Sequence, residues 1–172
     1  MDAADTRREL AVSDFANILK SRSYGLTLPQ EDDDAINRYV AMHSGERESV
    51  ERRPFRRQVD FWAFSIATAL ALKLNPREGT VGRWGKTFIY TNQGILDDDL
   101  GSLLAVIAVA KLGHDDPEVD EPRRIVELSN RFAGAGCPVV LKELGKIDLR
   151  TTPLDHALQF ASSLQDQVRS SQ

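Results

Sequence analysis

Arginine and lysine are concentrated, together with aromatic residues, in the segment 52–86. Eight cations stand there against two carboxylates, a net charge of +6, whereas the whole chain carries −4 and the remainder therefore −10. Guanidinium groups bind phosphates, and aromatic rings stack on bases. The pattern predicts a surface for nucleic acid or for an acidic protein. The predicted contact residues are Arg52, Arg53, Arg56, Arg57, Arg77, Arg83, Trp84 and Lys86.

A second interpretation of the same segment is a solvated face beside the core. Phe61, Trp62 and Phe64 lie in the most apolar stretch of the chain, where aromatic side chains usually belong to the core. The arginines at 52–57 could pair with the glutamates at 46–51 or with the acidic start of a helix. Exposed pairs of that kind contribute only about 0 to 1 kcal/mol each, so pairing alone does not explain the clustering.

The stretch 79–87, Gly-Thr-Val-Gly-Arg-Trp-Gly-Lys-Thr, resembles the Walker A phosphate loop. That loop needs a glycine, four further residues and then Gly-Lys-Thr, but Thr80 stands where the first glycine belongs. The loop should also leave a strand and open a helix, whereas here the predicted helix precedes it. We therefore expect no nucleotide hydrolysis, but a connection that can bind anions through Arg83 and Lys86.

Two acidic runs, 31–34 and 97–99, have the composition of metal ligands. Consecutive residues of a helix point about 100° apart, so adjacent carboxylates cannot converge on one ion unaided. Both runs stand where helices are expected to begin, and carboxylates there complement the helix dipole by roughly 0.3 to 1 kcal/mol each. The sequence predicts helix starts and no metal site.

His114 and Asp115 resemble the His-Asp pair of the HD family of metal phosphohydrolases, which are helical and use a further His upstream and an Asp downstream. His43 and Asp155 could fill these outer positions. The resemblance implies an alternative function, a metal-dependent phosphohydrolase centred on His114-Asp115. The residues at 113–117 favour a surface turn instead.

Cys137 is the single cysteine, so no disulfide can form within the chain, and we expect a cytoplasmic protein. Between Gly136 and Pro138, a lone cysteine is typically a small buried hydrophobe rather than a nucleophile. There is no Gly-x-Ser-x-Gly nucleophile elbow and no Cys/His array for zinc. We expect no catalytic residue, no metal and no cofactor, which disfavours an enzyme without excluding one.

Helical periodicity dominates the elements that must position these residues. The chain has 172 residues, 41% hydrophobic and 28% charged, which suits a single globular domain over 1–172. The pattern predicts an all-α fold, a compact bundle of five to seven helices. The predicted helices span 14–21, 29–43, 56–74, 98–112, 122–134 and 152–168.

The helices 56–74 and 98–112 are the most apolar and are expected at the centre of the bundle. Ser65, Thr68 and Lys73 interrupt the first, which falls short of the roughly 20 apolar residues of a membrane span. We therefore expect no membrane partner.

Residues 76–93, which contain three of the 11 glycines, predict an irregular or hairpin insertion between these two helices. Residues 87–91 have strand composition, and the plausible local strand partner is 80–81. Residues 139–144 fit either a short strand or a helical turn.

These observations favour a non-enzymatic binding or interaction module, a small subunit of a larger bacterial-type assembly whose segment 52–86 contacts nucleic acid. Residues 54–62, Pro-Phe-Arg-Arg-Gln-Val-Asp-Phe-Trp, resemble small helical accessory proteins of DNA-modification and phage-defence systems. The resemblance implies DNA binding as an accessory subunit in bacterial defence. The alternative is a protein scaffold or homo-oligomerisation subunit with no nucleic-acid contact.

Overall fold

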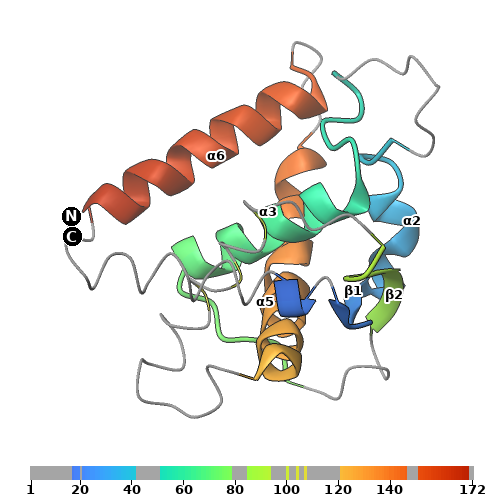
Figure 1. Ribbon diagram of the computed structural model, residues 1–172. Helices are drawn as coiled ribbons and strands as arrows, with labels where there is room; N and C mark the ends of the chain where they lie inside the picture. The colour runs from blue at the N-terminus through green and yellow to red at the C-terminus, as the bar shows by residue number, and fades with distance from the viewer. Residues whose placement is uncertain are drawn as a thin grey trace, which may run out of the picture. The chain divides into compact units, whose positions relative to one another are not determined.

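The computed structural model describes residues 17–19, 21–41, 51–78, 85–93, 100, 104, 107, 121–146 and 151–170. Contacts divide the chain into two compact units, Met1–Leu26 with Thr87–Ser129, and Thr27–Lys86 with Asn130–Gln172. The described part is mostly helical, with one two-stranded sheet (Figure 1). The all-α prediction therefore holds in outline only, because the sheet pairs residues 85–90 with residues 25–29, for which no strand was predicted.

In the first unit, Thr91 closes a turn against the residues that follow the first helix. Residues 17–19 and 21 are helical, and the Thr91 hydroxyl donates to the Arg22 carbonyl at 2.6 Å. The backbone N–H of Thr91 donates to the Tyr24 carbonyl at 2.9 Å. Leu100, Leu104 and Ile107, described members of the predicted helix 98–112, are helical and buried.

The sheet consists of β1 (Gly25–Pro29) and β2 (Gly85–Tyr90). A Cβ at Gly25 would lie 3.0 Å from Thr87, and one at Gly85 would lie 3.0 Å from Thr27, so the strands are antiparallel. Residues 87–90, which have strand composition, lie in β2. The partner of β2 in the sheet is β1, whereas the expected local partner 80–81 lies outside the described residues. The five residues 25–29 are too few for the sequence to show the alternating apolar pattern of a strand. In the structure, Leu26 and Leu28 are buried.

The predicted helix 29–43 is much shorter in the structure. A 3-10 turn, η1 (Gln30–Asp32), leads into α2 (Asp33–Ile36), and the chain then turns. Val40 forms an isolated parallel bridge with Phe55, in which Ala41 donates to the Phe55 carbonyl at 2.9 Å. This bridge takes the backbone groups that a longer helix would have used, so the prediction beyond Ile36 is wrong.

The central helix of the second unit is α3 (Gln58–Ala71), predicted at 56–74. Its start is fixed because the Asp60 carboxylate accepts the backbone N–H of Arg57 at 3.0 Å. Its end is a Schellman motif, in which Leu74 donates to the Ala69 carbonyl and Lys73 to the Leu70 carbonyl. Lys73 adopts the left-handed φ of 53° that this motif requires. The carbonyls of Ala69 and Leu70 are thereby satisfied, so α3 ends at Ala71, before the predicted end at residue 74.

The helix α5 (Pro122–Leu144) begins at Pro122 as predicted but does not end at Gly134. It continues through Gly136 and Pro138, and residues 139–144 are its last turns. Gly136 is needed because a Cβ there would lie 1.9 Å from the Ser65 carbonyl oxygen of α3. Packing against α3 outweighs the roughly 1 kcal/mol that a glycine costs inside a helix. The predicted end was therefore wrong.

The helix α6 (Pro153–Ser170) was predicted at 152–168, and its start and periodicity are confirmed. Asp155 accepts the backbone N–H and the hydroxyl of Thr152, both at 2.8 Å, and returns its own N–H to the Thr152 hydroxyl. Ala157 and Leu164 are buried, and the Phe160 ring lies 6.2 Å from that of Phe64 in α3. Figure 1 shows α6 along one side of α3, while α5 crosses α3 elsewhere.

Candidate functional site

The four predicted arginines at 52–57 precede α3, and they differ in their partners. Arg57 is held by Asp60, with its guanidinium 2.6 Å from the carboxylate. Arg53 donates to the Val40 carbonyl at 3.4 Å. Arg52 and Arg56 are exposed, and neither has a hydrogen bond or ion pair with any residue that the structure describes. Two of the four thus have guanidinium groups that no described residue engages.

Arg77 and Lys86 meet at the acidic segment that contains η1 and α2. Arg77 pairs with Glu31 and Lys86 with Asp33, each at 2.6 Å. A hydrogen bond from its own backbone, followed by the one from Arg77, lowers the pKa of Glu31 below its usual range. These two predicted contact residues therefore neutralise carboxylates of their own chain, while Arg83 and Trp84 lie outside the described residues.

The aromatic residues of the predicted binding segment belong largely to the core. Phe55, Phe61 and Trp62 are buried, and the Phe55 and Phe61 rings meet edge-to-face at 5.2 Å. The Trp62 indole N–H donates to the buried Asn130 side chain at 3.1 Å. These three aromatic side chains cannot stack on a base without unfolding the core. The alternative prediction, that Phe61 and Trp62 belong to the core, is therefore confirmed. Phe64 is only half-buried.

Cys137 is buried in α5, as the sequence analysis predicted, and is unsuited to nucleophilic catalysis. Its thiol donates to Asp32 at 3.7 Å. Burial, followed by the nearby Asp32 carboxylate, raises the pKa of the thiol far above its ordinary value. The thiolate, which is the nucleophilic form, is therefore suppressed. His156, a residue type that can act as a base for a thiol, instead shares a hydrogen bond with Thr151 at 2.9 Å.

Other chemical motifs fall largely outside the described residues. The phosphate-loop residues 79–84, the acidic run 97–99, and both His43 and His114-Asp115 lie there, so those hypotheses stay predictions. Within the described ranges, no group of three His, Cys, Asp or Glu side chains could hold a metal ion.

An apolar groove lies between α3 and α6 in the second unit. It has a volume of about 490 Å³. It is lined by Phe64, Ala67, Ala71, Ala161, Leu164, Gln165, Val168 and Arg169. Three of these residues are alanines, whose methyl groups leave space where larger side chains would have filled the contact between the helices. The groove was not predicted, although the positions of Ala67, Ala71 and Ala161 are visible in the sequence.

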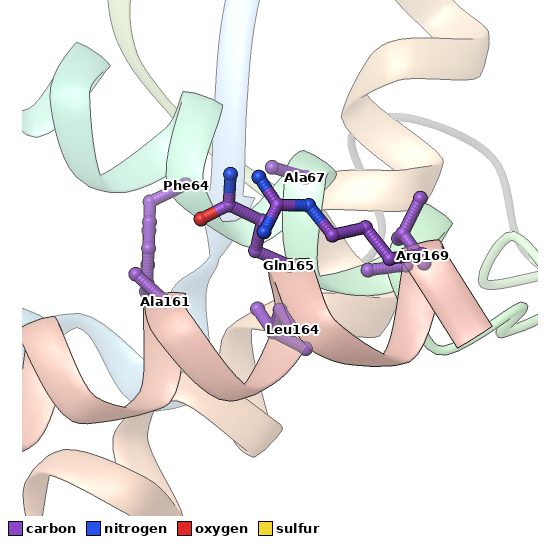
Figure 2. Close-up of a pocket in the computed structure, with 8 residues that line it drawn as sticks. Phe64, Ala67, Ala161, Leu164, Gln165 and Arg169 are labelled. Atoms are coloured by element: carbon purple, nitrogen blue, oxygen red, sulfur yellow. The ribbon is translucent and has the colours of Figure 1, made fainter.

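The rim of the groove is polar on one side only. Figure 2 shows the ends of Gln165 and Arg169 projecting from α6 over the groove, with Ala67 of α3 beyond them. Arg169 has no ion pair with any described residue. The lining residue Val168 is 42% accessible, and α6 also exposes Leu158, which is 61% accessible. The arrangement suits an apolar guest that carries a carboxylate near one end.

No helix among the described residues combines the length and the apolar character that a membrane crossing requires. In comparisons with known proteins, no protein-family model, curated protein or solved structure matches this chain.

Proposed function

We propose that this chain is a non-enzymatic interaction module that holds an apolar helical segment of a protein in the groove between α3 and α6. The observation that carries the proposal is the open groove of about 490 Å³ between two helices that otherwise pack together. Helix-in-groove recognition reads apolar anchors at helical spacing. The spacing of Phe64, Ala67 and Ala71 offers such a track along α3.

The test uses a displayed library of amphipathic helices of about 18 residues, a length of about 27 Å. We expect the library to yield peptides that bind the full chain and lose binding to the Ala67→Trp variant, because the new indole fills the groove. Ser163→Trp, on an exposed position of α6, adds the same side chain away from the lining and should retain binding. Circular dichroism and the thermal midpoint report whether both variants fold.

Two outcomes would contradict the proposal. One is that no helical peptide is enriched on the folded protein. The other is that the enriched peptides bind Ala67→Trp as well as they bind the unchanged chain, since they would then contact another surface.

A second candidate is nucleic-acid binding by the arginines that precede α3, within an accessory subunit of a DNA-modification or phage-defence complex in the cytoplasm. It is favoured by Arg52 and Arg56, which are exposed and have no carboxylate partner among the described residues. Affinity for a short DNA or RNA duplex should then fall steeply with salt. Phosphate contacts by arginine supply that salt dependence.

The variant for this test is Arg52→Ala with Arg56→Ala, because Arg57 also fixes the start of α3. The slope of log affinity against log salt should fall by about 0.9 for each contact removed. Lys73→Ala, at the other end of α3, is the matched control for the loss of one charge. An unchanged slope in the double variant would count against this candidate.

A further inference from the structure

The helix α6 has a second apolar face beside the one that packs on α3. The first face contains Ala157 and Leu164, which are buried, and Phe160. The second contains Leu154, Leu158, Ala161, Gln165 and Val168, separated by four, three, four and three residues. This alternation is the seam spacing of helices that pair along their length. The second face therefore has the pattern of a helix contact that the described residues leave open.

The second face and the groove are parts of one surface. Ala161, Gln165 and Val168 belong to the seam and also line the groove. A helix laid along the seam would thus enter the groove and reach Ala67 and Ala71 of α3. The small side chains there allow a close approach.

The seam is nearly self-complementary when a copy of it runs in the opposite direction. A two-fold axis between Ala161 and Ser162 places Leu158 of one copy opposite Gln165 of the other. The same axis places Leu154 beside Val168, and the small Ala161 at the crossing. The exposed Leu158 would then lie against Gln165, a groove residue of the second copy.

Charges on the flank of the seam fit the same register. In antiparallel helix pairs, residues on the same flank of the two helices face each other. With this axis, Asp155 of one copy lies about one residue, or 1.5 Å along the helix, from the position opposite Arg169 of the other copy. The Asp155 carboxylate engages Thr152 through Oδ2, which leaves Oδ1 for a partner. Arg169 has no ion pair among the described residues. A symmetric pair of copies would form this contact twice.

From the open groove, the seam spacing and the complementary charges, we infer that the occupant of the groove is α6 of a second copy of this chain, packed antiparallel, with Asp155 of each copy paired with Arg169 of the other. The inference rests on the proposed function and names the partner. A single helix pair of about 27 Å forms a small interface, so the dimer is expected to be weak, with a dissociation constant in roughly the micromolar range.

The test is the oligomeric state of the full chain, measured by sedimentation equilibrium from about 1 to 500 μM. The unchanged chain should pass from monomer to dimer in this range. Leu158→Glu should raise the dissociation constant by at least about tenfold, since it places a carboxylate in the seam of both copies. Gln159→Glu, an exposed neighbour outside the seam, should change it little.

A charge exchange tests the register itself. Arg169→Asp alone and Asp155→Arg alone should each weaken self-association, because like charges then meet twice. An equimolar mixture of the two variants should dimerise more tightly than either alone, since opposite charges meet at both ends. Because Asp155→Arg also removes a cap of α6, its thermal midpoint must be recorded, and Leu158→Glu provides an independent readout.

A chain that stays monomeric to 500 μM, or a mixture no tighter than its components, would overturn the inference. If helical peptides still bind and are blocked by Ala67→Trp, the proposed function survives with a different partner. If neither peptides nor a second copy bind, both proposals fail.

Discussion

The two sides of α3 use small residues for opposite purposes. On the side of α5, Gly136 lets the helices approach so closely that a methyl group would overlap the Ser65 carbonyl. On the side of α6, Ala67, Ala71 and Ala161 leave a groove of about 490 Å³. A small residue thus marks a close backbone approach only where the neighbouring helix uses the space. Where the neighbouring helix stays farther away, the same kind of residue leaves an open groove.

The largest effect is expected from Gly136→Ala on the closely packed side. The added Cβ would lie 1.9 Å from the Ser65 carbonyl oxygen, and neither backbone can move away without separating α5 from α3. We expect a loss of about 3 kcal/mol or more in the free energy of unfolding, measured by urea denaturation. Gly145→Ala is the control, since its nearest neighbour, the Leu141 carbonyl, is at 3.1 Å. Equal losses in both variants would refute the close contact.

Asn130→Ala tests the polar contact on the same side. The side-chain oxygen of the buried Asn130, Oδ1, accepts the Trp62 indole N–H at 3.1 Å and the Thr27 backbone N–H at 2.9 Å. Its removal leaves two buried donors unsatisfied, which should cost about 2 to 3 kcal/mol. Asn37→Ala, which removes a half-buried acceptor of Gln58, should cost less than about 1 kcal/mol. If Asn130→Ala and Asn37→Ala lose similar stability, water takes the place of the Asn130 side-chain oxygen in the first variant.

One substitution made on both sides of α3 compares them directly. Ala69 is fully buried, so Ala69→Leu should overpack and cost about 1 to 3 kcal/mol. Ala67 lines the groove, so Ala67→Leu should change stability by no more than about 0.5 kcal/mol. Thermal and urea unfolding measure both. If Ala67→Leu proves as costly as Ala69→Leu, the groove is closed in solution.

The helices with a clear apolar period could be predicted from the sequence. Pro122 and Pro153 marked the starts of α5 and α6, and Phe61 and Trp62 were expected in the core. The end of α5 could not, because Gly136, just past the predicted end at Gly134, packs against Ser65, more than 70 positions earlier in the chain. A local pattern cannot show that a breaker is stabilised by a distant contact.

The candidate sites differ in the same way. The cluster of cations was visible in the sequence, but the partners that neutralise Arg77 and Lys86 lie 46 and 53 positions away. The groove depends on how far apart two helices settle, which periodicity does not encode. The sequence therefore shows where cations are numerous, and only the fold shows which of them pair with carboxylates of the same chain.

The smallest effect concerns Glu31, at the polar edge of the closely packed side. Its pKa is lowered in the folded chain by its backbone hydrogen bond and by Arg77, so the unfolded chain binds this proton more tightly. The stabilisation is present above the unfolded pKa, ordinarily about 4.5, and is lost as the pH falls below it. Because the pair is half exposed, Glu31→Gln should remove less than about 1 kcal/mol at pH 7 and less at pH 3 than at pH 7.

Urea unfolding of Glu31→Gln at pH 7 and pH 3 measures the difference, with Glu78→Gln as the exposed control. A cost that is undiminished at pH 3 would show that Glu31 acts through packing rather than charge, and would place this edge with the closely packed contacts around Gly136.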